Sequence, residues 1–228
     1  YTEIQVPAEW AELTAKFENP NKDRFAPEFV KKVADIVNAQ AGDSLPVSSF
    51  VQYADGTMPS GTSAYEKRGV AVNVPQWIPE NCIQCNTCAF VCPHAAIRPF
   101  LLTEEEAANA PAGIKTKQGN GPLKEYKFAL SVSVADCTGC GNCVDVCIAK
   151  TKALQMVPYQ GQESEQDNFN YLNSKVGYKE NAVNKAANMK NAQFAQPLFE
   201  FSGACAGCGE TPYIKNITQL FGDHMMIA

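Results

Sequence analysis

The pattern of apolar and polar residues opens with a stretch that carries no cysteine. Residues 1–74 are expected to form a lead-in region that packs on the cysteine-rich part of the chain. After Pro27 apolar residues recur at helical spacing, and Gly42 is the kind of residue that commonly follows a helix end. The face predicted to be buried holds Phe29, Val33, Ile36 and Val37.

The rest of the lead-in region alternates short apolar runs with turn residues. We expect strands or extended arms over 44–51 and 70–74, a turn over 55–61 and a solvated charged loop over 65–69.

Residues 75–158 form an imperfect internal repeat. Each half has an extended lead-in, a cysteine loop, a short helix that begins near its fourth cysteine and an apolar exit. The two exits lie at 96–100 and 153–157, and the long connection between the halves is predicted to be an insertion over 98–127. The elements expected inside this region are a helix start over 104–108, a turn over 119–122 and a strand over 128–134.

The composition of the last part of the chain changes twice, from a polar segment to a short apolar segment and then to a loop. Residues 159–196 are polar and predict a connecting arm with a helix across 179–190. Residues 197–201 predict a strand, and a loop rich in glycine and cysteine follows it. We expect Thr211 to cap the next helix, with Pro212 in its first position. The side chains predicted for the buried side of that helix are Ile214, Ile217, Leu220 and Phe221.

Eight of the ten cysteines occur in two copies of the spacing C-x2-C-x2-C-x3-C, over 82–92 and 137–147. This run, with Pro93 after the first copy, is the signature of bacterial two-cluster ferredoxins. Three thiolates in one turn cover three corners of a 4Fe-4S cube, while the fourth points into the following helix and caps the other cube. The predicted ligands are Cys82, Cys85, Cys88 and Cys147 for cluster 1, and Cys92, Cys137, Cys140 and Cys143 for cluster 2.

Other uses of these cysteines fit less well. Zinc usually takes two separated C-x2-C pairs, and disulfides belong to secreted chains, for which no leader is present. Gly139 and Gly141 let backbone amides turn toward sulfide, although ordinary turns use glycine as well. His94 is expected to be exposed or capping, because eight cysteines already complete both cubes. His224 is expected in a turn, and Trp10 and Trp77 are expected to serve packing.

Composition limits the class of protein. A chain of 228 residues with 45% hydrophobic residues and a net charge of −5 suits one or two domains. No apolar run approaches the roughly 18 residues of a membrane span, and no basic patch interleaved with aromatics suggests nucleic acid. Ten cysteines without a signal peptide indicate a reducing cytoplasm. Tyr1 is not an initiator methionine, so both ends are expected to lie within a longer polypeptide.

The third cysteine pair, Cys205 and Cys208, is weak evidence alone, because it supplies only half a metal site. Its setting between a predicted strand and a predicted helix is more informative, since a helix N-terminus favours anionic groups. Residues 198–222 resemble the start of the thiamine diphosphate domain in the pyruvate:ferredoxin oxidoreductase family. Residues 65–88 resemble the same family's ferredoxin-like domain, so the resemblance covers most of residues 40–228.

The resemblance implies an α+β fold, in which a ferredoxin-like two-cluster unit with an insertion precedes the first strand, loop and helix of an α/β thiamine-binding domain over 197–228. It implies a cytoplasmic, homodimeric enzyme that decarboxylates pyruvate on thiamine diphosphate with Mg and makes acetyl-CoA from CoA. Electrons then leave through three 4Fe-4S clusters to ferredoxin or flavodoxin. Cys205 and Cys208 would supply half the ligands of the third cluster, and Glu210 would contact thiamine diphosphate. By itself, Glu210 is a first-turn carboxylate favoured by the helix dipole.

Three other functions remain open on the sequence. The first is a polyferredoxin-type electron-transfer subunit without its own catalysis, which would have no use for residues 197–228. The second is a structural zinc module. Within the enzyme interpretation, another 2-oxoacid could replace pyruvate, because the residues that choose the substrate lie elsewhere.

Overall fold

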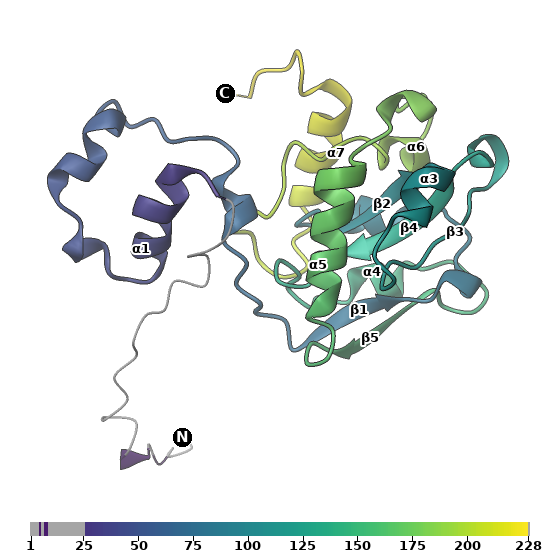
Figure 1. The fold of residues 1–228 in the computed structure, drawn as a ribbon, viewed down its shortest axis with the longest axis horizontal. Coiled ribbons are helices and arrows are strands. Elements are labelled where there is room, and N and C mark those ends of the chain that lie inside the picture. Colours follow the sequence, from purple (N-terminus) through teal and green to yellow (C-terminus); the bar gives the residue numbers. More distant parts are fainter. Residues whose placement is uncertain (1–4, 6, 9–25, 228) are drawn as a thin grey trace. The chain divides into compact units, whose positions relative to one another are not determined.

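The computed structural model describes residue 5, residues 7–8 and residues 26–227, and Trp10 lies outside this range. The chain divides into two compact units, residues 1–66 and 67–228, which are traced in sequence colours in Figure 1. No helix in the described part of the chain is long and apolar enough to cross a membrane.

The first unit is built of short helical turns. A π-helical turn (Val30–Ala34) runs into α1 (Asp35–Asn38). Phe29 and Val33 are buried as predicted, but Val37 is 46% exposed and Ile36 is only half-buried. The prediction fails there because a π turn holds more residues than an α turn and rotates the residues after it off the buried face.

The helix end and the following segment also differ from expectation. Gly42 was expected to follow the helix end, but α1 ends at Asn38, and Gln40, with φ 60°, is the residue that takes the left-handed conformation there. Residues 44–51 contain no strand: 3-10 turns span Gly42–Ser44 and Val47–Tyr53, and the second begins with a hydrogen bond of 2.9 Å from Ser49 N to Pro46 O. A further 3-10 turn covers Thr62–Tyr65.

The second unit is a small α+β fold with two antiparallel sheets, as the sequence predicted at this coarse level. Strand β1 (Asn73–Trp77) pairs with β5 (Leu154–Pro158). Strand β2 (Ile97–Leu102) pairs with β4 (Lys127–Val132), and β3 (Lys117–Gln118) lies on the other side of β4. Each half's lead-in strand therefore pairs with the exit strand of the other half.

The exit strands, the alternating strand and the insertion helix predicted for the repeat are confirmed, but the short helices expected to begin near each fourth cysteine, α2 (Thr87–Val91) and α4 (Asn142–Asp145), begin earlier and end before it. The two exits form β2 and β5, and the alternating stretch forms β4. The helix α3 (Glu104–Ala108) begins with a reciprocal cap, in which Glu106 N donates to Thr103 Oγ1 at 3.1 Å and Thr103 N donates to Glu106 Oε2 at 2.8 Å. Trp77 is buried and makes an edge contact with Phe128.

The helix of the connecting arm lies earlier than predicted. Helix α5 (Ser164–Tyr171) continues into a π turn (Leu172–Val176) and packs against β4 (Figure 1). The stretch 179–190 holds only a 3-10 turn (Glu180–Ala182) and the start of α6 (Met189–Ala192). Three buried apolar residues, Phe169, Leu172 and Val176, position α5 and the π turn that follows it, although the surrounding sequence is polar.

The carboxyl-terminal segment corrects three predictions. Residues 197–201 form no strand, and Phe201 has φ 48°. Helix α7 (Thr211–Phe221) is present with a proline in its first turn, but Glu210 stands at its N-cap position in place of Thr211, and the Glu210 side chain makes no capping hydrogen bond. Its predicted apolar side is not buried: Ile217 is 45% and Phe221 49% exposed, and Ile214 and Leu220 are only half-buried.

The face that α7 does bury is polar, and consists of Thr211, Lys215 and Gln219. Gln219 Nε2 donates to Ala195 O at 2.9 Å, and Lys215 donates to backbone carbonyls of α2 (Thr87–Val91). Hydrogen-bond partners therefore decide which face turns inward, and hydrophobic spacing does not. Residues 225–227 after the helix have no regular secondary structure, and His224 lies in a turn as predicted.

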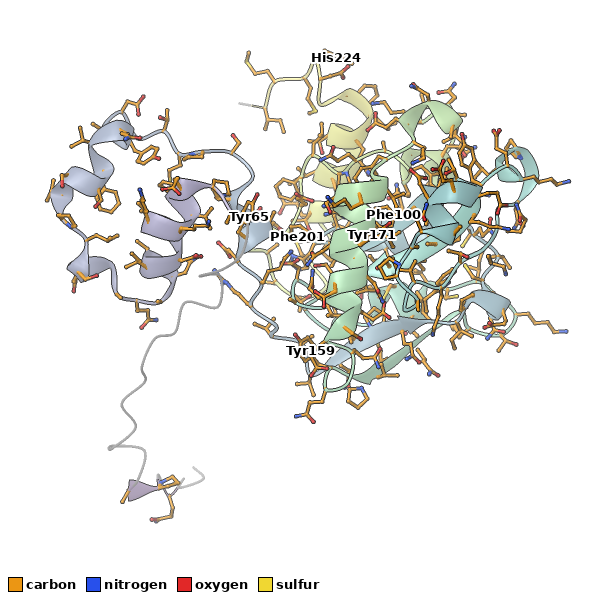
Figure 2. The ribbon with its side chains drawn as sticks, viewed as in Figure 1. Tyr65, Phe100, Tyr159, Tyr171, Phe201 and His224 are labelled. Atoms are coloured by element: carbon orange, nitrogen blue, oxygen red, sulfur yellow. The ribbon has the colours of Figure 1, made fainter. Side chains whose placement is uncertain are left out.

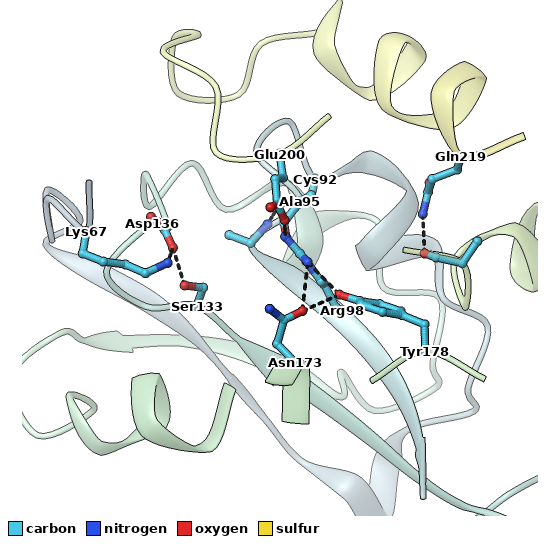
Figure 3. Close-up of polar contacts among 12 residues, drawn as sticks. Lys67, Cys92, Ala95, Arg98, Ser133, Asp136, Asn173, Tyr178, Glu200 and Gln219 are labelled. Atoms are coloured by element: carbon cyan, nitrogen blue, oxygen red, sulfur yellow. Dashed lines mark hydrogen bonds and ion pairs between the residues drawn. The ribbon is translucent and has the colours of Figure 1, made fainter. Parts of the chain in front are cut away.

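A buried polar network ties β2 to the arm and to the carboxyl-terminal segment (Figure 3). The Arg98 guanidinium is 2% exposed and donates to Tyr178 Oη at 2.6 Å and to Asn173 Oδ1 at 3.4 Å. It also forms an ion pair with Glu200. Arg98 thus joins three segments far apart in the chain through one rigid fork of donors.

Aromatic rings complete this junction. Phe100 and Phe201, which are labelled in Figure 2, each make edge contacts with Phe169, with ring centroids 6.0 and 6.4 Å apart. Lys67 Nζ lies 4.3 Å and Arg98 Cζ 4.9 Å from the ring centre of Phe201, so this ring contacts two cations. These contacts compensate the left-handed backbone of Phe201, which costs about 1–2 kcal/mol.

We expect Arg98→Met to lower the free energy of unfolding by about 3–5 kcal/mol, because it leaves the Glu200 carboxylate and the Tyr178 hydroxyl without their buried cation. Lys127→Met removes an ion pair with a largely exposed carboxylate, Glu104, and should cost less than about 1 kcal/mol. Urea unfolding of the 228-residue chain, followed by tryptophan fluorescence, measures both. Equal losses in the two variants would contradict the role given to Arg98.

Candidate iron–sulfur centres

The two cysteine loops share one backbone conformation. Gln84 and Asn86 both have φ 60° in the first loop, and Gly139 and Gly141 have φ 70° and 81° at the same positions of the second. Each loop therefore turns twice through the left-handed region between its first and third cysteines. This turn directs backbone amides toward the thiols.

In the first loop residues other than glycine adopt this conformation, at about 1–2 kcal/mol each. Their buried side-chain amides are held by distant parts of the chain. Gln84 Nε2 donates to Gln118 O at 2.7 Å and Gln84 Oε1 accepts from Asn120 N at 3.0 Å, while Asn86 Nδ2 donates to Lys190 O at 3.0 Å. The insertion and the arm thus stabilise the first loop, whereas glycine makes such support unnecessary in the second.

Eight thiols gather around two cavities, which are named here by their cysteines. Cavity A is lined by Cys82, Cys85, Cys88 and Cys147. Cavity B is lined by Cys92, Cys137, Cys140 and Cys143. The thiols assigned to one cluster by their spacing therefore lie around one cavity, three from one loop and one from the other half. That they bind iron stays a prediction.

Short helices bring the fourth thiol of each motif to the opposite cavity. Helix α2 carries Cys88 and ends before Cys92, and α4 (Asn142–Asp145) carries Cys143 and is followed by Cys147. Cys88 and Cys92 line different cavities although one turn of helix joins them, and the same holds for the other pair. Two short chain segments, from Cys88 to Cys92 and from Cys143 to Cys147, therefore connect the walls of the two cavities.

Apolar side chains close the walls of both cavities. Phe128, Leu130 and Leu154 line cavity A, and Ile97, Val132 and Met156 are among the residues that line cavity B. Burial raises the pKa of Cys137 to about 12 and also raises the pKa values of Cys88 and Cys143. Since iron binds the thiolate, cluster assembly must displace these protons.

Backbone amides donate to four of the thiols in two equivalent pairs. One pair comes from within the loops and the other from the residue just before each exit strand. These N–H···S bonds are Gln84 to Cys82 (3.4 Å), Gly139 to Cys137 (3.4 Å), Ala96 to Cys92 (3.3 Å) and Ala153 to Cys147 (3.4 Å). Such bonds stabilise thiolates that carry the negative charge of a cluster.

This arrangement suits a multi-iron cluster. Within the described residues, no three His, Cys, Asp or Glu side chains converge on one point as the ligands of a single metal ion do. Four thiols spread around an apolar cavity instead match a cube whose corner irons each take one thiolate. The donor set, the dry walls and the N–H···S bonds all fit this cofactor.

His94 is buried, at 3% exposure, so the prediction of an exposed or capping residue is wrong. Its Nδ1 lies 3.1 Å from Ser202 O, and its carbonyl accepts from Phe201 N at 3.0 Å. The side chain also lines cavity B. His94 is buried because it forms the docking site for residues 201–202, a contact between segments that are distant in sequence.

The third cysteine pair lies beside cavity B. A Cβ placed on Gly207, between Cys205 and Cys208, would stand 3.5 Å from the Cβ of Cys140. Cys205 is exposed and Cys208 is half-buried. Hydrogen bonds from the backbone amides of Thr211 and Glu210 lower the pKa of Cys208.

Glu210 itself is exposed where α7 begins. No described contact joins its side chain to either cavity. Its predicted role toward thiamine diphosphate therefore rests on the sequence resemblance.

Two charged residues near the site, Lys67 and Arg98, are buried more deeply than the sequence predicts. Lys67 belongs to the charged loop that was expected to be solvated, yet its side chain is 17% exposed and pairs with Asp136, which accepts from Ser133 Oγ (Figure 3). Arg98 is the one charged residue in an apolar exit strand, and this contrast is the sequence feature that could have indicated its burial.

Residues 75–148, which hold all eight of these thiols, match the family model described as a 4Fe-4S dicluster domain. Residues 16–71 match a second model, EKR, described as a domain of unknown function. These matches cover the greater part of the chain as two neighbouring segments.

Curated relatives confirm the resemblance to pyruvate:ferredoxin oxidoreductases. The chain is 56% identical to a pyruvate-flavodoxin oxidoreductase of Enterobacter agglomerans and 53% identical to the pyruvate:ferredoxin oxidoreductase of Moorella thermoacetica, over 99% of its length in both cases. It is 43% identical to the mitochondrial pyruvate dehydrogenase [NADP(+)] of Euglena gracilis. It spans 19% of the length of the two bacterial relatives and 12% of the third. The chain is therefore similar, along 99% of its length, to one segment of these longer oxidoreductases.

Crossed ligation can be tested by counting iron in double variants of the anaerobically purified protein. If Cys92 shares a cube with Cys137, then Cys92→Ala with Cys137→Ala damages one cube and leaves about four irons in this region. Cys92→Ala with Cys82→Ala damages both cubes and should leave almost none. The reverse pattern would mean that each motif holds its own cluster.

Proposed function

We propose that this chain is the electron-relay segment of a pyruvate:ferredoxin or pyruvate:flavodoxin oxidoreductase. The observation that carries the proposal is the arrangement of eight thiols as two sets of four around two cavities with largely apolar walls. Its occurrence in a chain that aligns over 99% of its length with these oxidoreductases favours an enzyme over a polyferredoxin-type subunit.

Each bound 4Fe-4S cluster supplies one-electron chemistry. The residues of this chain do the rest: Cys thiolates hold the irons, apolar walls exclude water, and amides from Gln84, Gly139, Ala96 and Ala153 stabilise the charge on sulfur. Exclusion of water and amide donors are the means by which proteins adjust cluster potentials.

The position of the third cysteine pair supports one direction for the proposed relay. The loop of Cys205 and Cys208 contacts Cys140 of cavity B, so we propose that electrons enter cavity B from that side and continue to cavity A. Cys205 and Cys208 are proposed to hold half of a third 4Fe-4S cluster. Cavity A would then deliver electrons to ferredoxin or flavodoxin.

In the complete enzyme, thiamine diphosphate with Mg carries the carbon chemistry, and this chain contributes Glu210 as a contact. Pyruvate and CoA give acetyl-CoA, CO₂, one proton and two electrons, and the two electrons reduce the external acceptor one at a time. We propose a cytoplasmic homodimer for this assembly.

The complete cubes provide the first test. We expect the 228-residue chain, reconstituted without oxygen, to bind about eight irons and eight acid-labile sulfides, four of each per cube. Elemental analysis and sulfide assay measure both. Stoichiometric zinc without labile sulfide would show that the cavities serve a different metal.

The second test separates relay from carbon chemistry. In the complete protein, Cys137→Ser should leave the reaction with pyruvate in rapid mixing intact, since that step belongs to thiamine diphosphate. Steady-state ferredoxin reduction should fall at least about tenfold, because serine is a poor, hard ligand for iron.

A loss of both rates in a folded, thiamine-loaded variant would contradict the relay assignment. Unchanged ferredoxin reduction would remove cavity B from the electron path.

A further inference from the structure

The carbonyls at the end of α2 are bonded by a lysine from the far end of the chain. Lys215, on α7, is 1% exposed. Its Nζ donates to Phe90 O at 3.0 Å, to Cys92 O at 3.4 Å and to Ala89 O. Three acceptors use all three hydrogens of an ammonium group, which places a positive charge at the negative end of this helix.

In the second half of the repeat, a lysine makes the same three hydrogen bonds to the end of the helix. Lys152 Nζ donates to Val144 O and Asp145 O at 2.8 Å and to Cys147 O at 3.0 Å, at the end of α4. In both halves the acceptors are the first, second and fourth residues after the third cysteine, Cys88 or Cys143. The two lysines therefore occupy equivalent positions in the pseudo-symmetric unit.

The two lysines differ in origin and in surroundings. Lys152 follows Cys147 by five residues and is exposed, whereas Lys215 lies 123 residues from Cys92 and is buried. The first half has no lysine of its own at this place, because the residue five positions after Cys92 is Ile97, which is buried in β2. The carboxyl-terminal helix supplies the missing cation.

A positive charge at the carboxyl end of α2 acts electrostatically on both cavities. Helix α2 carries Cys88, which faces cavity A, and leads into Cys92, which faces cavity B. A reduced cube carries one more negative charge than an oxidised one, and a buried ammonium is screened far less than an exposed one. The two lysines should therefore differ strongly in their effect on reduction.

We infer that Lys215 is a positioning residue through which α7 completes the first cysteine loop and makes the neighbouring clusters easier to reduce. This inference rests on the proposed function, since it requires clusters in cavities A and B. It makes docking of the carboxyl-terminal segment a condition for the normal potentials of the relay.

The test is a redox titration of the complete protein with dithionite as the electron source, followed by the electron paramagnetic resonance of the reduced clusters. Lys215→Met should lower the equilibrium constant for cluster reduction about tenfold. For a one-electron couple this is a shift of the reduction potential by ~59 mV to more negative values. Lys215→Arg, which keeps the charge, should stay near the wild type. Lys152→Met is the matched control and should shift the potential much less, because solvent already screens its charge.

Iron and labile sulfide are measured in every sample. If Lys215→Met loses iron, Lys215→Gln repeats the test with a side chain that still donates hydrogen bonds but carries no charge. Wild-type potentials in an iron-loaded neutral variant, an equal shift in Lys152→Met, or loss of iron from both neutral variants would overturn the electrostatic role. Absence of iron and sulfide from the wild type would instead refute the proposed function.

Discussion

The constraint on which the fold depends is that four thiols line each cavity, while one cysteine loop contributes only three of them. A three-thiol turn leaves one corner open, and the following helix carries its fourth cysteine away toward the other cavity. The halves can satisfy this constraint only by packing on each other. The strand pairing follows from it, since β1 joins β5 and β4 joins β2 across the repeat. Neither cavity exists in one half alone.

The segments outside the repeat stabilise that pair of cavities unequally. The second cysteine loop has glycine at both left-handed positions and needs little support. The first has Gln84 and Asn86, whose amides bond to the insertion and to the arm, and its helix is capped by Lys215. The first half of the repeat thus depends on residues that follow it by up to 126 positions, whereas the helix of the second cysteine loop is capped by Lys152 from its own half.

The carboxyl-terminal segment docks through charge and hydrogen bonds more than through apolar burial. Arg98 pairs with Glu200, Phe201 contacts two cations, and His94 bonds to the backbone of residues 201–202. Beyond this junction α7 turns Lys215 and Gln219 inward. These contacts hold the loop of Cys205 and Cys208 against Cys140, which is why the third cysteine pair adjoins cavity B.

The sequence by itself determined the cysteine groups, the exit strands and the insertion helix, because each rests on local spacing or on a cap such as Thr103 with Glu106. Only the tertiary structure decided the burial of His94 and Lys67, the place of α5 and the inward face of α7. At those positions the deciding partner is a carbonyl, a carboxylate or a ring from a distant segment. The spacing of hydrophobic residues does not reveal such partners. In the sequence, a buried lysine that donates to three carbonyls cannot be distinguished from an exposed lysine.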